Sequence, residues 1–261
     1  MGKGLRGGNR GGFVVKLLDI AYREFRRRDE KRQSASNFVD QHLDPFLKAA
    51  DELVGKLLSL GREDFQSLAD VRDDAPFSHS DFGSTAYLIA RLWAQIEILR
   101  QQALYVSISE DQRGRWLQQF LDCMESRSVR LIDRISQRAV GETLIADSGA
   151  ATVRYIDFIK SVEKSDTSRW LTPLVALLRK ATHTTERQHL LQYAVVFPAM
   201  IDTLDPDHSV TRDQPALPGK LTKQTWRNLR YRVFGTYLTF VPGVEKYIGR
   251  PKKRAADIDQ R

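Results

Sequence analysis

Apolar residues recur at steps of three and four along most of this chain, and no segment shows the sustained alternation of a β-strand. The clearest example runs from Phe82 to Ala103, where Ile89 and Trp93 belong to one apolar stripe and a second stripe of leucines lies beside it. Such a wide apolar face predicts a helix that is buried on most of its surface. The pattern therefore predicts an all-α fold, an antiparallel multi-helix bundle with basic N- and C-terminal extensions.

Caps and helix breakers predict where the helices begin and end. Asp44 and Pro45 have the form of an N-cap and a first helical residue, so we expect a helix to start at Pro45. Ser109 and Gln112 have the spacing of a capping box, and the apolar stripe after them predicts one helix to about residue 139. Further helices are expected over 13–33, 150–164, 173–183, 186–203 and 222–241.

Charge is distributed unevenly along the chain, whose net charge is +8. Residues 1–32 carry ten basic and four acidic side chains and residues 212–254 carry eleven and two, whereas residues 33–211 carry 19 and 25. The basic ends favour a polyanionic partner, although charged ends can also be solvated without one. We divide the chain into a Gly-rich basic start with a projecting charged helix (1–34), a helical body (35–211) and a basic aromatic C-terminal helix and tail (212–261).

The C-terminal segment combines aromatic and basic residues at helical spacing. Its apolar stripe consists of Trp226, Leu229, Val233, Tyr237 and Phe240. Arginine suits the basic stripe beside it, because the fork of guanidinium donors matches phosphate oxygens better than an ammonium group does. The candidate nucleic-acid or anion-binding residues of the whole chain are Arg26, Arg27, Arg28, Lys223, Arg227, Arg230, Arg232, Lys252, Lys253 and Arg254.

These features predict a non-enzymatic helical binding or regulatory protein that contacts nucleic acid through its basic terminal segments, mainly at phosphates. One alternative is a peripheral membrane or effector protein whose C-terminal amphipathic helix lies on an anionic bilayer. Another is a protein-interaction scaffold, since a helical bundle by itself says little about function. The sequence does not distinguish a homo-oligomer from a complex with another protein.

Motifs for catalysis are scarce. The sequence contains no P-loop, nucleophile elbow, dinucleotide fingerprint or zinc pattern. Glu186 and His189, close to His183, form a single Glu-x-x-His pair, whereas a di-iron bundle needs two. We therefore expect no metal and no cofactor.

An arginine and a histidine at short spacing occur twice, as Arg72 with His79 and as Arg179 with His183. In residue type these pairs resemble the Arg and His of HEPN-type ribonucleases, which lie together on one helix. The first pair spans Pro76 in a predicted loop, and the second is spaced more closely than in that family. A HEPN-like ribonuclease is therefore kept as an alternative, and enzymatic activity stays an open question.

The lone cysteine, Cys123, lies among apolar residues and allows no intrachain disulfide. No apolar run approaches the roughly 18 to 20 residues of a membrane-spanning helix, so no transmembrane segment is predicted. The basic start followed by a charged helix is a poor signal peptide. These features predict a cytoplasmic protein.

If the basic ends bind nucleic acid, the affinity should depend steeply on salt. Neutralising roughly six phosphates would make the logarithm of the association constant fall with a slope of about −5 against the logarithm of the salt concentration. Fluorescence anisotropy with a labelled oligonucleotide measures this slope. An affinity that does not change with salt would exclude binding through phosphates.

Overall fold

The computed structural model describes the backbone of residues 10–69, 71, 75–103, 108–162 and 165–249, and the side chains of these residues other than 10–25, 28, 32, 103, 165 and 166. The described residues form no strand beyond an isolated bridge between Ile145 and Thr152. The predicted all-α multi-helix bundle is confirmed. Its longer helices are α1 (Arg10–Arg62), α2 (Ser80–Ala103), α3 (Gln112–Glu125), α4 (Arg134–Glu142), α5 (Tyr155–Val162), α6 (Ser165–Arg179) and α7 (Thr184–Leu204).

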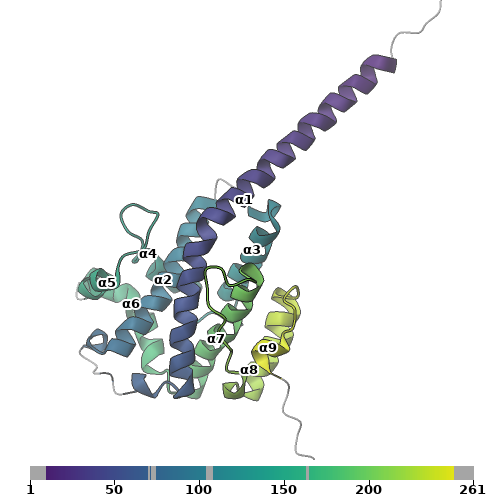
Figure 1. The fold of residues 1–261 in the computed structure, drawn as a ribbon. Coiled ribbons are helices and arrows are strands. Elements are labelled where there is room, and N and C mark those ends of the chain that lie inside the picture. Colours follow the sequence, from purple (N-terminus) through teal and green to yellow (C-terminus); the bar gives the residue numbers. More distant parts are fainter. Residues whose placement is uncertain (1–9, 70, 72–74, 104–107, 163–164, 250–261) are drawn as a thin grey trace, which may run out of the picture.

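The core lies where the second half of α1 packs against α2 on one side and α7 on the other (Figure 1). Phe46 and Leu53 of α1 are fully buried there, as are most residues of α7 after its first turn. α4 covers α2, and α3 packs on α7. The buried Trp93 of α2 donates a hydrogen bond from Nε1 to Tyr193 Oη of α7 at 3.3 Å, so the two helices are joined by a polar contact inside the apolar core.

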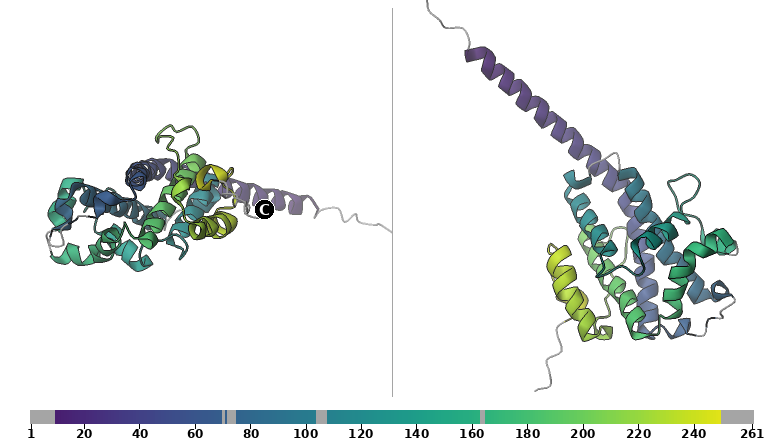
Figure 2. Two further views of the ribbon diagram at one scale, coloured as in Figure 1. Left: turned by 90° about the horizontal axis from the view of Figure 1, so that it is seen from below. Right: turned by 180° about the vertical axis from the view of Figure 1, so that it is seen from behind.

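The first half of α1 projects from the body as a single helix (Figures 1 and 2). Its described side chains are exposed up to Ser34, and Ala35 is the first buried one, next to the predicted boundary between the basic start and the body. Arg26 Nε donates a hydrogen bond to Glu30 Oε1 at 3.1 Å one turn along the helix, which is typical of a helix surrounded by water.

The predicted helix start at Pro45 is wrong, because α1 continues through this residue. Phe38, Leu43 and Phe46 bury one uninterrupted apolar face, whereas Asp44 and Pro45 are exposed. The carbonyl group that a proline leaves without its helical donor therefore lies on the solvent side, where water can satisfy it. Packing of the continuous face outweighs the local preference for a break.

Two further predictions of helix boundaries are corrected. The helix predicted to start after Ser109 begins instead at Gln112, and its N-cap is Asp111, whose carboxylate accepts a hydrogen bond from Gly114 N at 3.0 Å. It ends at Glu125 rather than near residue 139, and a turn leads to α4, which is capped by Asp133. The other corrected prediction is the helix start at Pro173, which lies inside α6.

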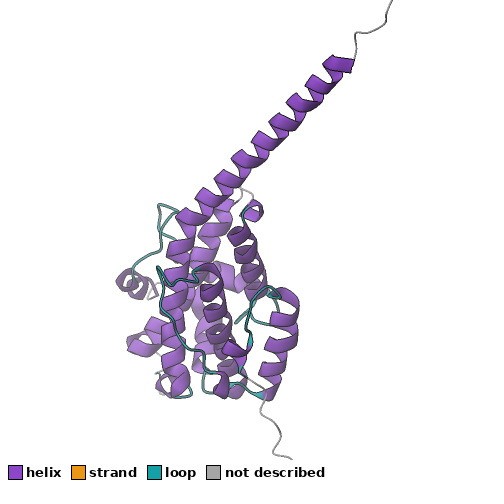
Figure 3. Cartoon of the chain, turned by 45° about the vertical axis from the view of Figure 1, so that its right-hand side comes forward, coloured by secondary structure: helices purple, strands orange, loops and turns teal. Residues whose placement is uncertain are grey.

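The C-terminal segment is not one regular helix. η4 (Pro218–Lys220) leads into the short α8 (Lys223–Arg227), which continues as the π-helix η5 (Asn228–Tyr237) and is followed by α9 (Glu245–Ile248). Figure 3 shows this segment lying along the side of the body. Most of its apolar residues pack inward, and Phe240 stacks on Trp116 of α3 with ring centroids 5.9 Å apart. The predicted apolar stripe, apart from the exposed Tyr237, thus holds the segment on the body.

Close packing between α4 and α2 depends on Gly141. A Cβ atom at this position would lie 2.8 Å from the backbone carbonyl of Trp93. We expect Gly141→Ala to lower the free energy of unfolding by about 1–3 kcal/mol, despite the better helix propensity of alanine. Chemical denaturation measures the change. Gly219→Ala, where nothing lies within 4 Å of the added atom, should be nearly neutral, and equal effects of both variants would contradict the close approach.

Candidate nucleic-acid interface

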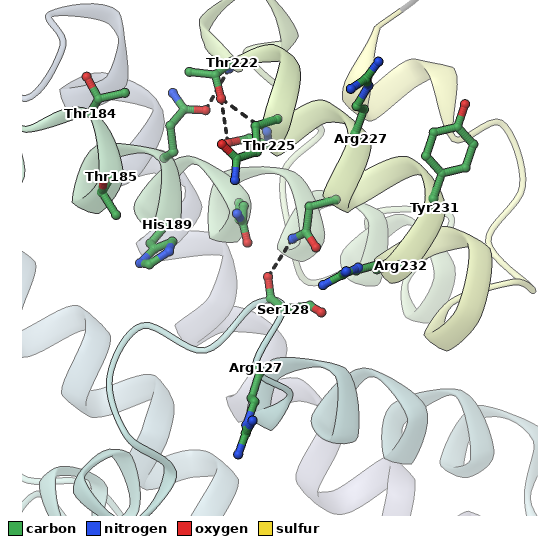
Figure 4. Close-up of a pocket in the computed structure, with 14 residues that line it drawn as sticks. Arg127, Ser128, Thr184, Thr185, His189, Thr222, Thr225, Arg227, Tyr231 and Arg232 are labelled. Carbon is green, nitrogen blue, oxygen red and sulfur yellow. Dashed lines mark hydrogen bonds between the residues drawn. The ribbon is translucent and has the colours of Figure 1, made fainter.

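A polar pocket of about 580 Å³ lies where the C-terminal segment meets α7 and the turn after α3 (Figure 4). The first turns of α7 supply one wall, and α8 with η5 supplies the opposite one. Arg127 and Ser128 of the turn complete it. The remaining lining residues are Thr184, Thr185, Gln188, His189, Gln192, Thr222, Gln224, Thr225, Arg227, Asn228, Tyr231 and Arg232.

The described lining of this pocket contains three arginines and no carboxylate. Arg127, Arg227 and Arg232 are exposed, and none of them forms an ion pair or hydrogen bond with another described residue. Elsewhere on the described surface many arginines are paired, as Arg91 is with Glu52. Unpaired guanidinium groups among neutral hydroxyl and amide side chains create a positive potential that attracts an anion.

Two side-chain clamps fix the shape of the pocket. Gln188 of α7 donates from Nε2 to Lys220 O at 2.9 Å and accepts from Thr222 N at 2.9 Å, so it holds the chain just before α8. On the other side, Asn228 Nδ2 donates to Ser128 O at 2.8 Å and ties the start of η5 to the turn after α3. The two walls are therefore held together by hydrogen bonds to backbone groups as well as by apolar packing.

The π-helix decides which arginines face the pocket. Its hydrogen bonds close wider turns than those of an α-helix, so the side chains have a different angular order from the predicted stripe. Arg232 lines the pocket, whereas Arg230 turns away and donates from Nη1 to Glu245 Oε1 at 2.7 Å. In Figure 4, Arg232 extends toward the turn that carries Ser128, and Arg127 and Arg227 lie on either side of it along the pocket.

The structure brings together only part of the predicted set. Arg227 and Arg232 share the pocket, and Lys223 is exposed on α8 but does not line it. Arg26 and Arg27 lie on the projecting half of α1, away from the C-terminal segment, so the two basic ends do not form one surface within the described structure (Figure 2). The side chain of Arg28 and the residues Lys252, Lys253 and Arg254 lie outside the part that the structure describes.

Sequence reasoning missed several pocket residues. Arg127 and Ser128 fell inside a predicted continuous helix, and nothing in their immediate sequence marks them as part of a site. Gln188 and Gln192 lie four residues apart on α7, which places them on one helix face. That spacing was the one available signal, because two glutamines on one face of a helix need polar partners when they are buried.

Most apolar residues of the C-terminal segment are covered by the fold, whereas Tyr231 and Tyr237 are exposed. Leu229 and Val233 are fully buried, Trp226 donates from Nε1 to Gly249 O at 3.3 Å, and Phe240 contacts Trp116. Binding to a bilayer through this face would require the segment to leave the body and expose these side chains. Among the described residues, no helix is long and apolar enough to span a membrane.

A second polar cluster of the described residues is already engaged by a lysine. Ligand atoms of Asp202, His208 and Asp213 converge within 4.8 Å, and Lys246 Nζ lies 2.6 Å from Asp202 and 3.8 Å from Asp213. Tyr247 Oη also donates to Asp202, and burial together with this carboxylate raises the pKa of Tyr247. In the described residues this is the one group of potential metal ligands that converges, and it does not include Glu186 and His189.

One of the two arginine and histidine pairs that resemble those of HEPN-type ribonucleases is divided between two helices. Arg179 is the last residue of α6, and His183 is the N-cap of α7, so they do not share a helix. His79 ends a short 3-10 turn before α2, and Arg72 lies outside the described residues.

Comparisons with models of protein families, with curated proteins and with solved structures give no match for this chain.

The loop between α7 and α8, which joins the two walls of the pocket, is organised by two carboxylates. Asp51 of α1 accepts hydrogen bonds from Arg212 N and Nε at 3.2 and 2.9 Å. Asp205 accepts from the backbone N–H groups of Ser209, Val210 and Thr211 and from two hydroxyl groups. Burial opposes the charge of Asp205, but these hydrogen bonds outweigh it and lower the pKa of Asp205 from 3.8 to about 2.

A lowered pKa in the folded state stabilises the protein above the unfolded pKa, and this contribution is lost as the pH falls toward 2. We expect Asp205→Asn to lower the free energy of unfolding by about 2 kcal/mol at pH 7. The difference from the wild type should shrink between about pH 4 and pH 2 in urea denaturation curves. The exposed Asp207→Asn is the control and should change little. A deficit of Asp205→Asn that stays constant over this pH range would disprove the role of the charge.

Proposed function

We propose that this protein binds nucleic acid through the pocket between α7 and the C-terminal segment. The observation that supports this function is a set of three arginines, Arg127, Arg227 and Arg232, that have no ion-pair partner among the described residues, in a pocket whose described lining contains no carboxylate. Guanidinium groups donate to phosphate oxygens in a fixed planar geometry, and they keep their charge at every physiological pH. The chemistry of the pocket therefore suits a phosphate ligand.

The placement of the arginines favours a chain of phosphates over a single one. Arg127, Arg232 and Arg227 are spread along the pocket and do not converge on one point (Figure 4). A strand with a phosphate at every nucleotide can contact each of them in turn, whereas one phosphate ion could not. The open N-terminal turn of α7, which contributes Thr184 and Thr185 to the pocket, adds backbone N–H groups and a positive dipole end.

Tyr231 supports a single strand in particular. Its side chain is 65% exposed, lines the pocket beside the arginines, and contacts Trp226 in a T-shaped arrangement at 6.2 Å between ring centroids. A basic groove with an exposed aromatic ring is the combination that single-strand-binding proteins use, because unpaired bases stack on the ring while arginines contact the backbone. On this proposal the protein acts by binding, and the projecting basic helix α1 adds further phosphate contacts.

Removing one pocket arginine should weaken binding without unfolding the protein. We expect Arg232→Gln to reduce the affinity for a single-stranded oligonucleotide at low salt and to reduce the steepness of the salt dependence by about 1. Arg230→Gln is a matched control on the same helix with the same change of charge, because Arg230 is paired with Glu245 outside the pocket. If both variants lose affinity equally, net charge and not the pocket controls binding, and the proposed site is wrong.

A further inference from the structure

Gln192 is a buried polar side chain of the pocket that the protein itself leaves unpaired. Its exposed fraction is 5%, and its Oε1 atom has no hydrogen-bond partner among the described residues. A buried acceptor without a donor destabilises a fold, and native proteins usually satisfy one with a protein group, a water molecule or a ligand. Since Gln192 lines the pocket, a ligand bound there can supply the missing hydrogen bond.

The neighbouring glutamine shows what a structural role looks like. Gln188 lies one turn earlier on the same face of α7 and uses both ends of its amide to hold backbone groups of Lys220 and Thr222. Gln192 belongs to the same wall of the pocket, and its amide oxygen accepts no hydrogen bond from another described residue. The two residues therefore have different roles, since Gln188 builds the wall and Gln192 is left for a ligand.

The chemistry of an amide narrows the choice of ligand. It presents a donor and an acceptor side by side, and rotation about its last side-chain bond is soft enough to turn either end toward the pocket. The edge of a nucleobase offers the complementary pair. Adenine suits a glutamine especially well, because its amino group donates to the amide oxygen while a ring nitrogen accepts from the amide nitrogen. A volume of about 580 Å³ is also in the range of sites for small organic ligands.

We propose that one unstacked base of the bound strand enters this pocket, where the side-chain amide of Gln192 reads its edge, an inference that rests on the nucleic-acid binding proposed above. Arg127, Arg227 and Arg232 hold the backbone on either side, and Tyr231 stacks on the same or the adjacent base. Gln192 is then the residue that determines base preference, in a protein whose other contacts go to phosphate and carry no sequence information.

Base preference can be separated from backbone binding with short single-stranded RNAs that each contain only one type of base, and with a strand of the same length that has no bases. The wild type should bind the adenine strand at least tenfold more tightly than the abasic strand, since hydrogen bonds to Gln192 and stacking on Tyr231 both need a base. Gln192→Leu should lose about tenfold in affinity for the adenine strand, while stacking on Tyr231 and the salt dependence remain. Because the lost amide is unpaired in the free protein, we expect thermal unfolding of this variant to be unchanged or shifted upward.

Gln119→Leu is the control, since Gln119 is an exposed residue of α3 outside the pocket and the same substitution there should leave base preference intact. Should Gln192→Leu not fold, nuclear magnetic resonance of the wild type replaces it: adding adenosine monophosphate should shift the side-chain amide signals of Gln192, and ribose 5-phosphate should not. Salt-dependent binding with equal affinity for abasic and base-containing strands would overturn the reading of a base and leave the proposed function standing. A wild type that binds no strand at all would overturn both.

Discussion

Docking of the C-terminal segment on the body is the interaction on which the candidate site depends. Leu229, Val233 and Leu238 are fully buried by this contact, and burial of side chains of this size contributes roughly 1.5–3 kcal/mol each. The pocket forms only when this segment is docked, because one of its walls is this segment and the other belongs to α7. The hydrogen bonds of Gln188 and Asn228 then fix the distance between the two walls. Apolar packing alone would leave this distance less defined.

The same docking connects stability with binding. The segment buries its apolar residues and leaves Arg227, Tyr231 and Arg232 at the edge of the interface, where no carboxylate of the described structure neutralises the two arginines. Asp202, near the other end of α7, is engaged by Lys246. The mildly acidic body thus presents a locally basic pocket, and the overall charge of a segment does not describe its surface potential.

α1 serves the molecule in two different ways along one continuous helix. Its second half is part of the core, and its first half is surrounded by solvent over the described side chains (Figure 1). Exposed arginines on such a projection can move with it, whereas those of the pocket are held on packed elements. This difference favours the pocket over the projecting helix as the place where a ligand is selected, since selection needs groups held in a fixed geometry.

The sequence by itself determined the helical fold, because a period of three and four in apolar residues is a local property that burial enforces. It also indicated the basic C-terminal segment and two of the arginines in the pocket, Arg227 and Arg232. Only the tertiary structure decided that α1 runs through Pro45, that Arg230 turns to Glu245, and that Arg127 and Gln192 join the site. These outcomes depend on contacts between residues far apart in the chain, and the energies of such contacts exceed the local preferences of caps, prolines and helical register.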